Sequence, residues 1–370
     1  MAELLKDQFG HDVAERIAAA LEHEVPDFDA KAFVRDCLDG FDELELTGRA
    51  KHIAAAMAAH LPADRAEALR VVTRSLGEEG DQPWGGMEGF FYLPHVYFVA
   101  EHGLDHFEEA MAAQYELTKR FTAEFSIRAY LEAHPEATLA RLREWTSDPN
   151  EHPRRLVSEG TRPRLPWASR LKAFQADPAP VIELLELLKD DESEYVRRSV
   201  ANNLNDIAKD HPELVVELAG RWWADADENR RRLIRHGLRT LIKAGDAGAL
   251  AVLGYGPDSP LVVRSVTVEP QEVPIGGKVR VDLLIENPAA STVGGLIDLR
   301  LHFVKANGET SPKVFKGSEI EVAPGDTATF GKSISVKQHS TRTHYPGTHR
   351  VEVLVNGEAR PGPSFELLPE

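Results

Sequence analysis

Residues 151–167 read EHPRRLVSEGTRPRLPW, and the chain on either side repeats the first part of this stretch. Residues 134–160 match residues 211–237 at a constant spacing of 77, and a third copy fits between them over residues 177–200. Each copy has a proline near its start, where a helix tolerates it because the first N–H groups have no partner within the helix. Periods of roughly 30 to 50 residues with two helices per copy are typical of HEAT-like α-solenoids.

The unequal spacing of the copies singles out the end of the quoted stretch. The middle copy is displaced by 43 residues from the first and by 34 from the last, so that extra residues follow Gly160. They include the run Arg162-Pro163-Arg164-Leu165-Pro166-Trp167. The prolines stiffen this loop and exclude a helix. A stiff loop with arginine and tryptophan favours a contact surface, although a connector whose tryptophan fills a gap between helices explains it too.

The repeat also draws attention to Glu159. Its counterparts in the middle and last copies are Asn202 and His236, so this helix position is polar in all three. A shared polar ridge that faces a ligand is one interpretation. The other is an exposed end of a helix, with Gly160 as its cap.

The net charge of −17 argues against nucleic acid, but the charge is uneven along the chain. Residues 1–140 hold 12 Lys and Arg against 27 Asp and Glu, whereas residues 141–243 hold 19 against 18. Arginines of the middle block recur at repeat positions, namely Arg154, Arg155, Arg197, Arg198, Arg230, Arg231, Arg232 and Arg235. A row of them on stacked copies could hold phosphates, and a row of solvated salt bridges fits the pattern equally well.

Composition describes a soluble globular protein, with 42% hydrophobic and 28% charged residues. The N-terminal residues lack the apolar run of a secretory signal, and the sequence contains no apolar segment long enough for a membrane span. The single cysteine, Cys37, excludes an intrachain disulfide and a cysteine-rich metal site. We expect a cytoplasmic protein that needs no metal or other cofactor.

Glu124 is a second candidate carboxylate. It lies between Arg120 and Arg128 in a segment whose phenylalanines we expect to be buried. Pairing with one of these two arginines is the default interpretation. A carboxylate separated from Glu159 by a helix pair would also supply the charge stabilisation that an active site needs.

The second helix of the middle copy carries an unusual number of amides. Asn202, Asn203 and Asp206 share a helix face, although asparagine and aspartate are poor helix formers. A polar ladder between repeats explains them, and so does a surface that faces a ligand.

After Leu253 the pattern changes to short alternating segments separated by turns. About seven strands without cysteine suggest an immunoglobulin-like sandwich. The sequence therefore predicts a multidomain α + β protein, with a HEAT-like solenoid over residues 1–253, a linker over 254–260 and a β-sandwich over 261–370. One sandwich loop, residues 337–350, lacks carboxylates and offers donors that suit phosphates or a minor groove. A polar hairpin tip is the alternative for this loop.

Three pieces of the sequence carry a family resemblance: TKRFTAEFSIRAYL at 118–131, HPRRLVSEGTRPRLPW at 152–167 and VRRSVANNLNDIAKDHPEL at 196–214. They resemble the AlkC branch of the HEAT-like-repeat alkylbase DNA glycosylases, and the sandwich resembles the extra domain of some members. The resemblance covers nearly the whole chain and shows no departure at these motifs. It implies excision of cationic N-alkylated bases from duplex DNA, chiefly 3-methyladenine, with 3-methylcytosine as a second candidate.

The resemblance also implies the site residues. Glu124, Glu159 and Asp206 are similar to acidic positions of the active site, and Arg155 and Trp167 match positions that line the lesion and the backbone. The remaining candidates for DNA contact are Arg162, Arg164, Asn203, His339, Ser340, Thr341, Arg342 and His344. A 3-alkylated adenine already carries positive charge, so two carboxylates that stabilise a cationic sugar and orient water suffice. The implied protein is a monomer that acts on damaged duplex DNA in the bacterial nucleoid, without a membrane partner.

A non-enzymatic scaffold is the rival hypothesis, because many helical repeats bind a protein partner on their concave face. It predicts that salt-sensitive DNA binding is absent and that Glu159→Gln changes no catalytic property. The arginine, proline and tryptophan of the broken repeat favour the glycosylase instead.

Overall fold

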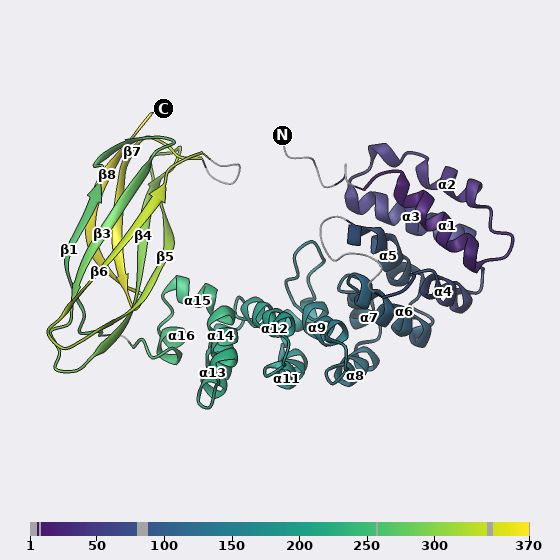
Figure 1. Cartoon of the computed structure of the whole chain (residues 1–370), viewed down its shortest axis with the longest axis horizontal. Coiled ribbons are helices and arrows are strands. Elements are labelled where there is room, and N and C mark those ends of the chain that lie inside the picture. The colour runs from purple at the N-terminus through teal and green to yellow at the C-terminus, as the bar shows by residue number, and fades with distance from the viewer. Residues whose placement is uncertain (1–5, 7–8, 80–87, 257, 339–342, 370) are drawn as a thin grey trace. The chain divides into compact units, whose positions relative to one another are not determined.

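The computed structural model describes residue 6 and residues 9–79, 88–256, 258–338 and 343–369. The chain divides into two compact units, Met1–Asp210 and His211–Glu370, and each unit is described here by itself (Figure 1).

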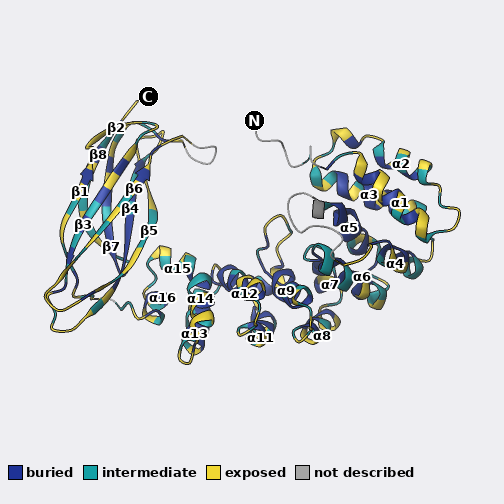
Figure 2. Ribbon diagram, in the orientation of Figure 1, coloured by how far each residue is buried: buried dark blue, intermediate teal, exposed yellow. Residues whose placement is uncertain are grey.

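The first unit is helical. Its N-terminal helices are α1 (Asp12–Glu24), α2 (Ala30–Leu38), η2 (Phe41–Glu43), α3 (Leu46–His60), α4 (Arg65–Arg74), η3 (Glu88–Tyr92), α5 (Leu93–His102) and α6 (Phe107–Arg120). Its later helices are α7 (Ser126–Ala133), α8 (Pro135–Trp145), α9 (Glu151–Gly160), α10 (Lys172–Ala176), α11 (Ala179–Leu188) and α12 (Glu194–Ile207). Figure 2 shows buried residues along the helix faces that pack against one another.

The predicted repeat is confirmed as three helix pairs. The first two copies form α8 with α9 and α11 with α12, and the third forms α13 (Pro212–Trp223) with α14 (Glu228–Gly237). The sequence between the first two copies is a loop followed by the short helix α10, as the prolines predict. Gly160 is the last residue of α9, and a Cβ atom there would lie 2.5 Å from Cγ2 of Ile127. This glycine is therefore required by a close helix contact, and not by a left-handed cap.

The first arginine of the repeated Arg-Arg pair builds the turn within each of the first two copies. Arg154 Nη1 donates hydrogen bonds to the carbonyl oxygens of Asp148, at 2.8 Å, and Pro149, at 3.3 Å. Arg197 Nη1 donates to the equivalent carbonyls, those of Asp191 at 2.5 Å and Glu192 at 2.8 Å. These two arginines of the expected basic row are thus used to close a turn.

Arg154 also joins the two copies. Its Nε and Nη2 donate to Oδ2 and Oδ1 of Asp191 at 2.7 and 3.0 Å, and the two side chains are only 9% and 5% exposed. A bidentate pair of this kind offsets the cost of removing both charges from water.

The second unit contains four helices in its described part and a sandwich. The helices are α13, α14, α15 (Arg239–Ala244) and α16 (Ala247–Val252). The strands are β1 (Val262–Glu269), β2 (Glu272–Pro274), β3 (Lys278–Glu286), β4 (Val293–Val304), β5 (Thr310–Val322), β6 (Thr327–Ser335), β7 (Gly347–Val355) and β8 (Glu358–Leu368). They form a sheet of order β1-β3-β6 and a sheet of order β2-β8-β7-β4-β5. The pairing is antiparallel except between β2 and β8.

Alternation along the strands buries one side chain in two between the sheets. In β3 the buried residues are Val279, Val281, Leu283 and Ile285, which belong to one apolar core with residues of the other sheet. The chain changes from helix to strand between Val252 and Val262, where the sequence predicts a linker. The compact units nevertheless divide at residue 210, so the last helices belong with the sandwich, and the domain limits at 253 and 261 stay a prediction.

Among the described residues, no helix is both long enough and apolar enough to cross a membrane.

The buried pair between the first two copies leads to a stability prediction. We expect Asp191→Ala to lower the free energy of unfolding by about 3 to 5 kcal/mol, because it leaves Arg154 buried without its carboxylate. Urea unfolding of the full chain, followed by circular dichroism, measures this. Glu192→Ala is the control, since Glu192 lies 3.6 Å from the same guanidinium but is 90% exposed. Equal losses in the two variants would contradict the expectation.

Candidate active site

Glu124 lies in the turn between α6 and α7. The hydroxyl of Thr122 donates to Glu124 Oε2 at 2.9 Å and accepts from the backbone N–H of Glu124 at 3.2 Å. Arg155 Nη1 lies 2.7 Å from the same carboxylate oxygen. The expectation that Glu124 pairs with Arg120 or Arg128 is therefore wrong.

The two expected partners are occupied elsewhere. Arg120 is bound to Glu116 and to the carbonyl of Gly77, and Arg128 donates to backbone carbonyls. Glu124 turns instead to an arginine that is 31 residues away in the sequence.

Glu159 lies one helical turn after Arg155 on α9 and is buried. Its Oε1 lies 3.6 Å from Arg155 Nη2 and accepts a hydrogen bond from Arg162 Nη1 at 2.6 Å. Its Oε2 accepts a hydrogen bond from the hydroxyl of Ser199 on α12, also at 2.6 Å. Both oxygens of this carboxylate are thus held, one by charges and one by a neutral donor.

Arg162 continues the series to a third carboxylate. Its Nε donates to Oδ2 of Asp206 at 2.8 Å, and the other oxygen of Asp206 accepts from Lys209 Nζ at 2.8 Å. Glu124, Arg155, Glu159, Arg162 and Asp206 therefore form a row of alternating charges, the carboxylate–arginine chain. The structure brings together all three acidic residues that the sequence singles out.

The charges along this row outweigh burial. Burial alone would raise the pKa of Glu159, but the attraction of Arg155 and Arg162 and the hydrogen bond from Ser199 bring its pKa below the ordinary value. Burial alone would likewise lower the pKa of both arginines, and the neighbouring carboxylates raise it. Glu159 therefore stays ionised at neutral pH although it is only 6% exposed.

Access to the carboxylate–arginine chain differs between its ends. The side chains of Glu124 and Arg155 are 14% and 16% exposed, whereas that of Asp206 is 2% exposed. A cationic group or a water molecule can approach the Glu124 end, while Asp206 anchors the other end from within. Fixed negative charge beside a partly open surface is suited to stabilising a positive charge that develops during a reaction.

Two residues that contribute to this site were not identified from the sequence. Ser199 holds Glu159, and Tyr195 places its ring 5.3 Å from the guanidinium carbon of Arg155. Tyr195 is 39% exposed and also contacts His152 edge-on at 5.7 Å. Both residues lie on the face of α12 that carries Asn203, at four-residue spacing. That spacing is the signal by which they could have been found.

Asn203 serves the packing of α12 against α9. It is fully buried, and its Nδ2 donates to the carbonyl of Ser158 at 2.8 Å and to Oγ1 of Thr161 at 3.1 Å. Of the two interpretations of the amides on this helix, polar contacts between repeats therefore account for Asn203. Its contact with DNA stays a prediction.

The loop after α9 has a fixed backbone. Arg128 is buried, and its Nη1 donates to the carbonyls of Gly160, at 3.1 Å, and Arg162, at 2.7 Å, while its Nη2 donates to the carbonyl of Ser169. One guanidinium thus holds both ends of the loop. Burial lowers the pKa of Arg128 to about 10, and the group remains charged at neutral pH.

Trp167 stands at the tip of this fixed loop. It is 75% exposed, and its backbone adopts a left-handed conformation with φ of 64°. Arg164, on the same loop, is paired with Asp210 through Nε at 2.8 Å. The alternative of a connector whose tryptophan fills a gap between helices is wrong, because Trp167 faces solvent.

The sandwich candidates are only partly visible. His339, Ser340, Thr341 and Arg342 lie outside the described residues. His344 is 4% exposed and packs its ring 5.2 Å from that of Phe303. The contact of this loop with DNA stays a prediction.

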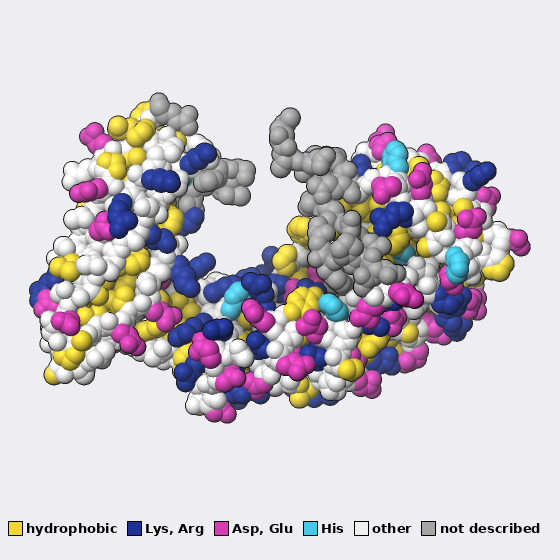
Figure 3. All heavy atoms as spheres, viewed as in Figure 1, with side chains coloured by type: hydrophobic (Ala, Val, Ile, Leu, Met, Phe, Trp, Pro, Cys, Tyr) yellow, Lys and Arg dark blue, Asp and Glu magenta, His cyan; other side chains and the backbone are white. Residues whose placement is uncertain are grey.

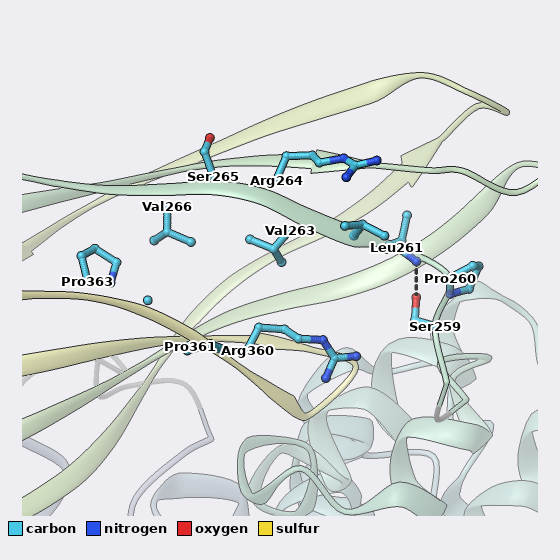
Figure 4. Close-up of a pocket in the computed structure, with 12 residues that line it drawn as sticks. Ser259, Pro260, Leu261, Val263, Arg264, Ser265, Val266, Arg360, Pro361 and Pro363 are labelled. Atoms are coloured by element: carbon cyan, nitrogen blue, oxygen red, sulfur yellow. Dashed lines mark hydrogen bonds between the residues drawn. The ribbon is translucent and has the colours of Figure 1, made fainter.

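Two other features of the described residues carry no site. No group of three or more His, Cys, Asp or Glu residues in the described part could hold a metal ion. An open pocket of about 600 Å³ lies between β1 and β8, lined by Val263, Val266 and Pro363 (Figure 4). Its two arginines, Arg264 and Arg360, are paired with Glu286 and Glu358. Among the described residues, its lining contains no carboxylate or histidine that could act as a base beside the hydroxyls of Ser259 and Ser265.

The loop anchor leads to a prediction about proteolysis. We expect Arg128→Lys to speed trypsin cleavage after the exposed Arg170 by about tenfold, since an ammonium cannot reproduce the guanidinium fork that holds three carbonyls. Limited proteolysis with mass spectrometry measures the rate. Arg120→Lys, the same change at another arginine that binds a carbonyl, should leave it unaltered. An unchanged cleavage rate in Arg128→Lys would show that other contacts hold the loop.

Comparisons with known proteins identify the family of this chain. Residues 118–241 match the model of the DNA alkylation repair enzyme family, and residues 262–369 match that of the C-terminal Ig-like domain of YhaZ. The chain is 34% identical over 364 residues to the uncharacterized protein YhaZ of Bacillus subtilis, with 98% of this chain and 99% of that protein covered.

The fold is also similar to a solved structure over its full length. The alkylpurine DNA glycosylase AlkC of Pseudomonas fluorescens, bound to DNA that contains an abasic site analog, superposes with a TM-score of 0.88. The sequences are 35% identical, and the match covers 99% of this chain and 100% of that one. The chain therefore belongs to the AlkC branch of the HEAT-like-repeat alkylbase DNA glycosylases.

Proposed function

We propose that the protein is a DNA glycosylase that hydrolyses the N-glycosidic bond of cationic N-alkylated bases in duplex DNA, with 3-methyladenine as its main substrate and 3-methylcytosine as a further one. The observation that supports this most directly is the full-length similarity to AlkC bound to DNA, together with three carboxylates gathered in one row of charges.

The chemistry of the substrate explains why carboxylates suffice. A 3-alkylated adenine is already cationic, so the base leaves without protonation, and positive charge then develops on the sugar. Glu124 and Glu159 stabilise that charge and orient a water molecule for attack on the anomeric carbon. No covalent intermediate with a lysine is needed.

Asp206 and the arginines have supporting parts in this proposal. Asp206 is deeply buried and fixes Arg162, which in turn fixes Glu159. Arg162 accordingly positions the carboxylates, and its earlier assignment as a DNA ligand stays a prediction. Arg155 offsets part of the negative charge of Glu124 and Glu159 and faces the phosphodiester backbone beside the lesion. Its charge keeps the row of carboxylates compatible with a polyanionic substrate.

Further contacts with DNA come from the loop after α9 and from the sandwich. Trp167 packs at the lesion from its fixed loop, and Arg164 lies on the same loop as a backbone ligand. Residues 339–344 of the sandwich grip a groove and offset the cost of bending the duplex, on the order of several kcal/mol. We further propose that the protein acts as a monomer, without a cofactor, on DNA in the nucleoid.

The proposed reaction predicts the effect of neutralising each carboxylate. We expect Glu124→Gln and Glu159→Gln to slow release of 3-methyladenine from methylated DNA by about a hundredfold or more, since each removes charge that stabilises the transition state. Single-turnover release measures the rate, and fluorescence anisotropy confirms that the variants still bind DNA. Glu151→Gln, on the exposed side of α9, is the control. A wild-type protein that binds duplex without releasing base would mark a DNA-binding solenoid, and one that does neither would favour the scaffold.

A second prediction concerns pH. The hydroxyl of Ser199 helps to hold the pKa of Glu159 low, so Ser199→Ala should raise that pKa. The carboxylate then becomes protonated at a higher pH as the solution is acidified. The acidic limb of the rate profile should therefore shift to higher pH, and Ser199→Thr should restore it.

Ser158→Ala is the matched control for this pH profile. Ser158 is also fully buried and adjoins Glu159, but its hydroxyl has no hydrogen-bond partner among the described residues. Its removal should leave the profile in place. A profile that is identical in Ser199→Ala and wild type would exclude Glu159 as the group that limits the rate in acid.

A further inference from the structure

Three basic residues of the second unit recur at four-residue spacing. Arg235 lies on α14, and Arg239 and Lys243 lie on α15. Leu238, between the two helices, keeps a helical backbone with φ of −83° and ψ of 0°. The side chains therefore project from one side of a nearly continuous helical turn, because residues four apart are neighbours on a helix.

A fourth cation comes from the sandwich. Lys316 on β5 lines the same small pocket as these three residues. Figure 3 shows Lys and Arg side chains gathered where α14 and α15 adjoin the neighbouring edge of the sandwich. We call Arg235, Arg239, Lys243 and Lys316 the basic cluster.

The acidic residues of this pocket do not cancel the basic cluster. Glu319 lies 3.4 Å from Nη2 of Arg235, and Asp298 is buried and accepts the backbone N–H of Gly317 at 2.7 Å. Burial raises the pKa of Asp298, while the hydrogen bond from Gly317 and the charges of Lys316 and Lys243 oppose this shift. The pocket thus holds four cations against two carboxylates in a chain whose net charge is −17.

Arg235 is the member of the basic cluster that is held in place by two contacts. Its guanidinium carbon lies 5.6 Å from the ring of Trp223, and its contact with Glu319 holds the other side. Lys243 and Lys316 are exposed, and Arg239 is half-buried. Arg154, Arg230 and Arg232 of the repeats also face carboxylates.

We propose that Arg239, Lys243 and Lys316 bind phosphates of the DNA backbone at a site separate from the carboxylate–arginine chain. The site rests on the proposed function only in taking DNA as its ligand. Ammonium and guanidinium groups that project from a helix and a strand neutralise phosphates without reading bases. The basic cluster therefore contributes affinity for any duplex, damaged or not, and takes no part in breaking the glycosidic bond.

The test is salt-dependent binding of the full chain to an undamaged duplex, followed by fluorescence anisotropy. We expect Arg239→Glu/Lys243→Glu to weaken binding by about tenfold or more and to flatten the slope of log affinity against log salt by about two. Lys243→Gln/Lys316→Gln, which only removes charge, should change both quantities in the same direction. Circular dichroism and thermal unfolding establish that the variants fold.

The control has the same change in net charge elsewhere in the second unit. Arg221→Glu/Arg232→Glu alters two exposed arginines that do not line the pocket, and it should weaken binding far less. An equal loss in this control would overturn the site, because net charge alone would then explain the effect. Unchanged affinity in both basic-cluster variants would overturn it as well.

The rate of base release tests the basic cluster independently of the proposed function. Single-turnover release of 3-methyladenine at saturating DNA should be unchanged in Arg239→Glu/Lys243→Glu, which would support a purely binding role. Slower release at saturation would overturn that role. If the wild-type protein releases no base while the basic-cluster variants still lose duplex affinity, the glycosylase proposal fails and the phosphate site stands.

Discussion

A carboxylate withdrawn from water has to be paired, and Glu159 meets this requirement with partners from three segments. Arg155 lies on the same helix, Arg162 on the loop that follows it and Ser199 on α12. Because Arg155 also holds Glu124 and Arg162 also holds Asp206, one buried charge ties together the start of α7, the loop and two repeat copies. The same charge pairs therefore both pack the repeats together and arrange the site.

The repeated Arg-Arg pair shows how a solenoid can carry chemistry without leaving its pattern. Its first arginine closes the turn of its own copy through the same two carbonyl positions in the first two copies. Its second arginine projects in a different direction, because successive residues lie about 100° apart around a helix, and in the first copy it meets two carboxylates. The arginine that closes the turn and the arginine that pairs with Glu124 and Glu159 are thus adjacent in sequence, and helical geometry directs them to different partners.

Rigidity of the loop after α9 has a physical source in Arg128. Prolines limit the backbone of this loop, but the buried guanidinium fixes where its two ends lie. An exposed tryptophan on a backbone that is already ordered loses little conformational entropy when it contacts a ligand. Trp167 has a left-handed backbone conformation, which is strained for a residue with a side chain and persists because the surrounding structure holds it.

The sequence by itself determined the helical repeats, the break after Gly160 and the alternating strands of the sandwich, because these are periodic or local patterns. The three acidic residues were singled out together by the family resemblance of their motifs. The sequence could not determine which side chains of the site pair with one another. Glu124 bonds to Arg155 and not to a neighbour on its own segment, and Ser199 and Tyr195 reach the site from a helix about 40 residues further along. Those partners follow from how α9 packs on α12, and pairing of buried charges depends on that three-dimensional contact rather than on sequence spacing. Only the tertiary structure could decide it.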